Sequence, residues 1–128
     1  MGAKVMVVDD SALSRRMMRR ILEGGGHEVA EETNGIAALE RYALDKPAVV
    51  VLDLVMAGMY GLDALIELRR LDPDARVIVA SADIQRATRD EVMAAGARGF
   101  VSKPFVADDV LRAVDAALAS VAPEGSPR

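Results

Sequence analysis

Short apolar runs alternate with longer amphipathic segments along almost the whole chain, and this alternation limits the possible folds more than any other feature. The apolar runs are rich in valine and bounded by glycine, proline, aspartate or serine, which is typical of buried strands. They cover residues 4–8, 27–31, 48–53, 76–81 and 99–102. Mostly apolar strands joined by helices predict a parallel sheet with helices on both faces and right-handed crossovers.

Helical patterns fill the intervals and predict helices over about residues 11–22, 35–44, 62–71, 85–95 and 107–121. In the first helix, we expect Met17 and Met18 to face the core. In the second, Ile36, Leu39 and Ala43 are expected to share one apolar side. The predicted fold class is therefore α/β, a five-stranded parallel sheet that is doubly wound as (βα)5 and flavodoxin-like.

The composition suits one globular domain, because the 128 residues are 52% hydrophobic and 28% charged. We expect this domain to cover residues 1–121 and residues 122–128 to form a mobile tail. The absence of cysteine excludes a disulfide framework, thiolate zinc sites and cysteine nucleophiles. A net charge of −4 argues against direct binding of nucleic acid. The chain has no apolar run of the roughly 20 residues that span a membrane and no signal peptide, so we expect a cytoplasmic protein.

Polar side chains follow the predicted strands at one edge of the sheet. Asp9 and Asp10 come after the first strand and Asp53 ends the third. Ser81 ends the fourth strand, and Lys103 follows the fifth. Because the ligand sites of open parallel sheets form outside the carboxyl ends of the strands, we expect these five side chains to converge.

This set of side chains favours a particular chemistry. Three neighbouring carboxylates repel one another and so favour a bound cation, and oxygen ligands suit Mg²⁺. The Lys103 ammonium would then pair with an anion such as phosphate. No histidine or cysteine nucleophile accompanies the set. The candidate nucleophile near the metal is therefore a carboxylate, which can accept a phosphoryl group as an acyl phosphate.

Four segments at these strand ends resemble the signature segments of the response-regulator receiver domain of two-component signalling: VVDDS, VVLDLVMAGMYGLD, VIVASAD and GFVSKPF. The similarity covers residue 4 to about residue 120, and the length is close to that of single-domain, CheY-like members. The resemblance implies a phosphoacceptor signalling protein rather than an enzyme, with self-catalysed phosphotransfer and dephosphorylation only.

The resemblance also implies a role for each residue of the acidic edge. Asp53 is the implied phosphoacceptor. Asp10 and Asp53 would bind magnesium directly, with the backbone carbonyl of Val55 as a third ligand. Asp9 would act mainly through a bound water. Lys103 would pair with the carboxylate and afterwards with the phosphoryl group.

The signal would leave the site through two further side chains, according to the same resemblance. Ser81 would be the switch hydroxyl, and Phe100 would change from an outward to an inward position. The surface altered would be roughly residues 85–120, which we take as the face that binds the downstream protein target. Receivers usually have a cis bond before the proline that follows the lysine, so we expect the Lys103–Pro104 bond to be cis.

The implied phosphodonor is a histidine kinase or a histidine phosphotransfer protein, and the receiver itself is expected to be a monomer. The sequence RRMMRR at residues 15–20 places four arginines on the first helix. We expect all four on its exposed side, as a solvated basic face or as a docking face for the kinase. His27, the single histidine, lies at a strand start and is expected to be a boundary residue rather than a phosphocarrier.

Two other functions stay open at this point. A magnesium-dependent phosphatase of the haloacid dehalogenase type also phosphorylates an aspartate at a strand end. That family needs a second aspartate two residues later, where this chain has Val55. A degenerate receiver would bind partners without phosphorylation, although the complete set of acids, hydroxyl and lysine argues against it.

Overall fold

In the computed structural model, which describes residues 2–56, 60–82 and 85–120, five parallel strands form one sheet in the order β2-β1-β3-β4-β5. The order reverses between β1 and β3, and this is the position at which open α/β sheets place their ligand sites. The strands are β1 (Lys4–Val8), β2 (Glu28–Glu32), β3 (Val49–Asp53), β4 (Val77–Ser81) and β5 (Gly99–Ser102).

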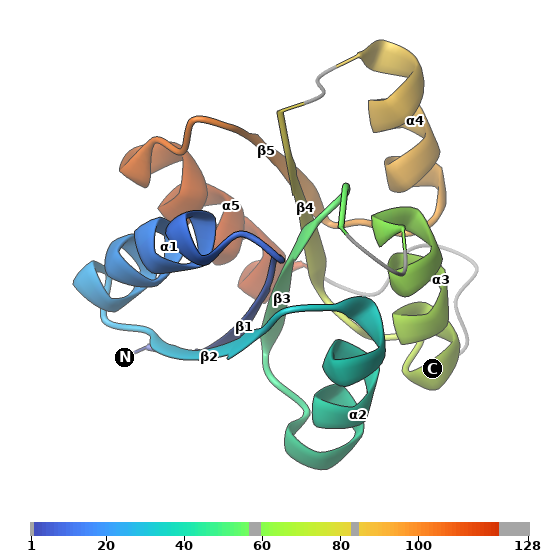
Figure 1. Ribbon diagram of the computed structural model, residues 1–128, viewed down its shortest axis with the longest axis horizontal. Coiled ribbons are helices and arrows are strands. Elements are labelled where there is room, and N and C mark those ends of the chain that lie inside the picture. Colours follow the sequence, from blue (N-terminus) through green and yellow to red (C-terminus); the bar gives the residue numbers. More distant parts are fainter. Residues whose placement is uncertain (1, 57–59, 83–84, 121–128) are drawn as a thin grey trace.

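The helices of the described residues cover both faces of this sheet, with α1 and α5 on one face and α2, α3 and α4 on the other (Figure 1). All predicted elements are present, with ends within two residues of the expected ones, so the predicted fold class is confirmed. The expected tail, residues 122–128, lies outside the described residues. The helices are α1 (Ala12–Gly24), α2 (Gly35–Asp45), α3 (Gly61–Leu71), α4 (Arg86–Ala94) and α5 (Ala107–Ala119).

Each face of the sheet has its own apolar core, because successive side chains of a strand point to opposite faces. On β3, Val51 packs toward α1 and α5, whereas Leu52 packs in the core beneath α2 and α3. Every residue of β3 and of β4 is buried. This burial extends to Asp53, the last residue of β3, which is a carboxylate at the edge of the core.

The helix α1 buries a narrower side than the sequence predicts. Met18 is buried as expected, but the side chain of Met17 is 41% exposed. The expectation that all four arginines are exposed is also wrong. Arg15 and Arg19 form ion pairs with Glu31 of β2, with N–O distances of 3.0 and 2.5 Å. These two pairs hold α1 against β2 and fix the rotation that turns Met17 outward.

The helix α2 is also rotated relative to the prediction. Ile36 is 62% exposed and Ala43 is exposed, whereas Leu39 is partly buried and Tyr42 is buried. This rotation of α2 is explained by a polar contact: the Tyr42 hydroxyl donates a hydrogen bond to Oδ2 of Asp72 at 2.8 Å. Burial raises the pKa of Tyr42, and so the hydroxyl keeps its proton for this bond.

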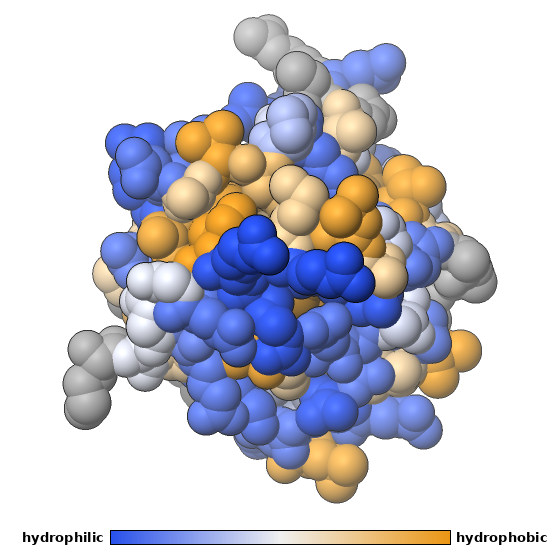
Figure 2. Space-filling view, turned by 60° about the vertical axis from the view of Figure 1, so that its left-hand side comes forward, coloured by the Kyte–Doolittle hydropathy of each residue, from blue (hydrophilic) through white to orange (hydrophobic). Residues whose placement is uncertain are grey.

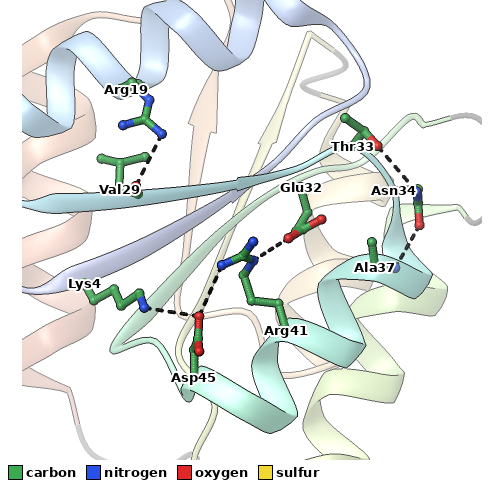
Figure 3. Close-up of polar contacts among 9 residues, drawn as sticks. All are labelled: Lys4, Arg19, Val29, Glu32, Thr33, Asn34, Ala37, Arg41 and Asp45. Carbon is green, nitrogen blue, oxygen red and sulfur yellow. Dashed lines mark hydrogen bonds and ion pairs between the residues drawn. The ribbon is translucent and has the colours of Figure 1, made fainter.

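A polar network fastens α2 to the sheet (Figure 3). The Asn34 side chain caps the helix by accepting a hydrogen bond from the first turn at 2.8 Å. Arg41 pairs with Glu32 of β2, and Asp45 at the end of the helix accepts from Lys4 of β1 at 3.1 Å. None of the helices in the described ranges is long and apolar enough to cross a bilayer.

Candidate functional site

The carboxyl ends of the strands surround an open cleft of about 420 Å³ at the reversal of strand order. This cleft brings together all the residues expected at the acidic edge, and of the whole predicted set only Phe100 does not line it. The lining residues are Asp9, Asp10, Ser11, Asp53, Val55, Ser81, Ala82 and Lys103.

Three carboxylates meet in this cleft because β1 and β3 are neighbours. Val8 lies opposite Leu52 in the sheet, so the residues that follow each of them leave the strands side by side. One carboxylate oxygen from each of Asp9, Asp10 and Asp53 lies within 4.8 Å of the others. Asp9 and Asp53 are buried, whereas Asp10 is exposed and open to solvent.

The start of α1 positions Asp9. Its Oδ1 accepts a hydrogen bond from the backbone N–H of Ser11 at 2.9 Å, and the Ser11 hydroxyl caps the helix by accepting from the N–H of Ser14 at 3.2 Å. Arg15 donates to the backbone carbonyl of Asp9 at 2.8 Å. The sequence analysis missed this role of Arg15. The feature that could have indicated this role is Glu31, which pairs with Arg15. That pairing can be predicted only when it is known that the strand of Glu31 lies beside the first strand.

Lys103 lies between the two buried carboxylates. Its Nζ is 3.2 Å from Oδ2 of Asp9 and 3.5 Å from Oδ1 of Asp53. The backbone N–H of Lys103 donates to the carbonyl of Ser81 at 3.0 Å, which ties this loop to the end of β4. The Lys103–Pro104 bond is cis, as predicted. Of the described residues that line the cleft, Lys103 is the one with a positive charge, so the negative charges exceed it.

The surroundings of Asp53 shift its pKa. Burial, and secondly the neighbouring charge of Asp9, raise the pKa of Asp53 from 3.8 to about 6. The charge of Lys103 and a hydrogen bond from the backbone N–H of Val55 oppose this shift without cancelling it. The cleft therefore favours the arrival of a further positive charge.

Gly61 lets α3 begin directly beside the acidic cleft. A Cβ atom at this position would lie 2.5 Å from the carbonyl oxygen of Asp53 and 2.5 Å from Cα of Leu54. The N–H of Gly61 instead donates to the carbonyl of Leu54 at 2.8 Å. No side chain fits in this contact, so the position requires glycine.

Comparison with known proteins gives the family of this arrangement. The family model of the response regulator receiver domain matches residues 5–115. The chain belongs to this family. The receiver is 43% identical over 116 residues to the chemotaxis protein CheY of Thermotoga maritima. This alignment covers 90% of this chain and 97% of that protein. It is 40% identical over 119 residues to the chemotaxis protein CheY of Bacillus subtilis, covering 92% and 99%.

Solved structures agree with this assignment. A two-component response regulator of the LuxR family from Aurantimonas sp. SI85-9A1 superposes with a TM-score of 0.89 at 30% identity, covering 95% of this chain and 89% of that one. The protein is thus a CheY-like receiver of two-component signalling, a signalling domain rather than an enzyme in the usual sense. The comparisons support neither the phosphatase nor the degenerate receiver that the sequence left open.

The donor set of the receiver fits a divalent metal ion such as Mg²⁺. The acidic cluster supplies only oxygen ligands, and Mg²⁺ keeps several waters while it takes one or two carboxylates. Asp10 is exposed, so a hydrated ion can reach the cluster from solvent. Burial, and secondly the charge of Asp9, raise the pKa of Asp53, and a cation beside its carboxylate would favour the ionised form.

The two predicted switch residues of the receiver lie beyond the acids. Ser81 is buried at the end of β4, and Phe100 on β5 is partly buried against the core on the α2–α4 face. The guanidinium of Arg89 on α4 lies 5.6 Å from the centroid of the Phe100 ring. The sequence analysis did not identify Arg89, because one arginine on a helix carries no signal of the ring it covers.

Proposed function

We propose that Asp53 accepts a phosphoryl group from the phosphohistidine of a kinase or of a phosphotransfer protein. The observation that carries this proposal is the position of the Asp53 carboxylate. It is buried except for 5% of its surface, lines the open cleft, and lies 3.5 Å from the Lys103 ammonium. A carboxylate in water is repelled by an anionic phosphoryl group. A carboxylate beside a fixed cation can approach that group, because the cation offsets part of the negative charge.

The proposed step forms an acyl phosphate. A carboxylate oxygen of Asp53 attacks phosphorus, the bond from phosphorus to the donor nitrogen breaks, and the departing imidazole nitrogen takes up a proton. The Lys103 ammonium, now 3.2 Å from Asp9 and 3.5 Å from Asp53, can then pair with a phosphoryl oxygen. Its contact with Asp9 holds it in place throughout.

For the metal, we propose that Asp10, Asp53 and the backbone carbonyl of Val55 hold Mg²⁺ directly and that Asp9 acts through a bound water. The exposed position of Asp10 and the buried position of Asp9 support this division. When bound, Mg²⁺ would offset charge on the phosphoryl oxygens. Asp9 is engaged by the N–H of Ser11 and by Lys103, which favours contact with the ion through a water rather than directly.

For the output, we propose that the Ser81 hydroxyl donates to the phosphoryl group and that Phe100 moves inward in response. The support is that both side chains lie at neighbouring strands, since Ser81 pairs with Ser102 and Val79 pairs with Phe100. The surface that changes is residues 85–120, the output face, which would bind the downstream target. Only a target with different affinities for the two arrangements can read this change.

For the phosphodonor, we propose that the exposed side of α1 is the docking face. This side carries Arg16 and Arg20 together with Leu13, which is 62% exposed, and Met17. The side of the molecule formed by α1 and α5 comes forward in Figure 2, where hydrophobic side chains border a broad hydrophilic area. Exposed apolar side chains beside two exposed guanidinium groups suit a partner surface that is acidic and partly apolar.

We further propose that the protein acts in the cytoplasm as a monomer, without direct contact to nucleic acid or to a membrane. The net charge of −4 supports the lack of nucleic-acid binding. Signalling would then depend on protein partners alone, the phosphodonor at α1 and the target at the output face.

Intact-mass measurement after incubation with a small phosphodonor and Mg²⁺ tests the acceptor. The protein should gain the mass of one phosphoryl group, and Asp53→Asn should gain none because the amide is not a nucleophile. Asp45→Asn is the matched control, since Asp45 is an exposed acid far from the cleft and should leave the gain intact. A stable phosphoryl group on Ser81 or Ser102 of the unmodified protein would contradict the proposal.

A further inference from the structure

A positive charge lies over the aromatic ring of the predicted switch residue. Arg89 belongs to α4 and Phe100 to β5, and Cζ of Arg89 lies 5.6 Å from the centroid of the Phe100 ring. Arg89 is exposed, whereas Phe100 is partly buried and packs against the apolar core on the α2–α4 face. The Phe100 ring therefore contacts both the apolar core and a guanidinium at the surface.

The attraction between this guanidinium and the ring favours the position in which Phe100 reaches the surface. The face of an aromatic ring carries partial negative charge and attracts a guanidinium within about 6 Å of its centroid. At an exposed site this attraction changes a conformational equilibrium by roughly two- to fivefold. Because Arg89 is exposed, its charge stays in contact with water and the contact carries no cost of burying it.

An inward movement of Phe100 would break this contact. Phe100 lies opposite Val79 on β4, and Ser81 is two residues further along that strand. Side chains two residues apart point to the same face of a sheet, so Val79 and Ser81 both face the α2–α4 side. Both are buried, so a ring that moves toward Ser81 enters the interior. The Arg89 guanidinium could follow the ring only by giving up its contact with water, which is costly for a charge.

We propose that Arg89 is a positioning residue of the switch, which holds Phe100 in the outward arrangement while Asp53 is not phosphorylated. This inference rests on the proposed function, in which Phe100 moves inward when Asp53 carries a phosphoryl group. Phosphorylation must then overcome the attraction between ring and guanidinium, which limits signalling by the unphosphorylated receiver. By linkage, removal of the cation should strengthen the binding of a phosphate mimic by the same factor of roughly two to five.

Two substitutions of Arg89 separate the effect of its charge from that of its length. Arg89→Met keeps a long, unbranched side chain that favours a helix but removes the charge, whereas Arg89→Lys keeps the charge. Arg70→Met is the matched control. Arg70 is an exposed arginine of α3, outside residues 85–120, and pairs with Glu67 on the same helix.

Fluorine NMR of protein labelled with fluorophenylalanine reports the position of the ring. The chain has two phenylalanines, Phe100 and Phe105, and so gives two signals. In Arg89→Met without a phosphate mimic, the Phe100 signal should move part of the way toward its position in the unmodified protein with beryllofluoride bound. In Arg89→Lys and Arg70→Met it should stay near its unmodified position. With Mg²⁺ present, beryllofluoride should bind Arg89→Met roughly two- to fivefold more tightly than it binds the unmodified protein or the other two variants.

The affinity for beryllofluoride separates a shifted switch from a local change at the ring, because loss of a charge beside the ring also alters the Phe100 signal directly. Equal affinities of Arg89→Met and Arg70→Met would overturn the role of Arg89. So would equally tight binding by Arg89→Lys and Arg89→Met, because the charge would then not be the cause. Either result would leave the proposed switch intact. A Phe100 signal that does not move when beryllofluoride binds the unmodified protein would instead overturn the switch itself, and this inference with it.

Discussion

The two ends of the sheet carry opposite charges, and these charges have different partners. At the carboxyl end, Asp9, Asp10 and Asp53 face one lysine, and the pKa of Asp53 rises to about 6. At the amino end, Arg69 donates to the carbonyl of Pro73, and Arg76 and Arg98 donate to oxygens of Ser120. A carboxyl can take up a proton or a metal, but a guanidinium keeps its charge. The charge of the acidic end can therefore vary with pH or with a bound ion, whereas the charge of the arginine end is fixed.

Removal of the Lys103 ammonium should have the largest effect at the acidic end, on both stability and phosphorylation. In Lys103→Met, two buried carboxylates lose their shared cation, so we expect the free energy of unfolding at pH 8 to fall by about 3 kcal/mol. The rate of phosphorylation should fall by roughly 100-fold. Urea unfolding and intact-mass time courses measure both. Lys4→Met, which breaks the more exposed pair with Asp45, should destabilise the protein much less than Lys103→Met.

Removal of the acceptor charge should have the next largest effect, with the opposite sign. Because the folded-state pKa of Asp53 is raised from 3.8 to about 6, the folded state binds this proton more tightly than the unfolded state. The stabilisation is complete below about pH 4 and is lost as the pH rises through about 6. In a chelator at pH 8, Asp53→Asn should therefore be more stable than the unmodified protein by on the order of 2 kcal/mol.

The pH dependence makes this test specific. The advantage of Asp53→Asn should shrink as the pH falls and vanish near pH 4, which urea unfolding at a series of pH values would show. Asp45→Asn should follow the opposite course, because Lys4 and Arg41 lower the pKa of Asp45. A constant advantage of Asp53→Asn across the whole range would mean that charge is not its cause.

Magnesium should produce a smaller effect that is confined to the acidic end. A weak site at about tenfold excess over its dissociation constant stabilises the folded state by about 1.4 kcal/mol. We expect Mg²⁺ to raise the unfolding midpoint of the unmodified protein and to leave that of Asp10→Asn unchanged. Differential scanning calorimetry measures both, and Asp45→Asn should keep the full response. An equal response in Asp10→Asn would place the ion elsewhere.

The smallest change in stability is expected for the switch hydroxyl. Ser81→Ala removes one buried hydroxyl at about 1 kcal/mol or less, and Asp53, Asp10 and Lys103 remain in place. The variant should still accept a phosphoryl group. With a beryllofluoride-type mimic of phosphate, its amide chemical shifts should change less across residues 85–120 than those of the unmodified protein. Full-sized shifts there would show that Ser81 is not the relay.

The sequence predicts the acidic end well because strand ends are local features. Asp53 closes an apolar run that can only be a buried strand, and the parallel sheet then places Asp9 and Lys103 beside it. The rotation of the helices was not predictable in the same way. Met17 and Met18 are adjacent apolar residues, and the choice between them depends on ion pairs of α1 with Glu31 on another element.

The arginine end was missed for a related reason. Arg69, Arg76 and Arg98 are separated in the sequence, and no motif joins them. They meet only because β4 and β5 are neighbours and because α5 returns Ser120 to the same place. Side chains that act together through tertiary structure alone leave no pattern in the sequence.

The ion pairs that fix the rotation of α1 also divide its apolar residues into a buried set that stabilises the fold and an exposed set. Met18 and Leu22 are buried against the sheet, whereas Leu13 and Met17 are displayed outside. Exposed substitutions usually change stability by less than about 0.5 kcal/mol. The outer positions can therefore be exchanged for those of another receiver without disturbing the core. If α1 is the docking face proposed above, replacing a few exposed residues on this one helix should change which phosphodonor the receiver accepts without loss of stability.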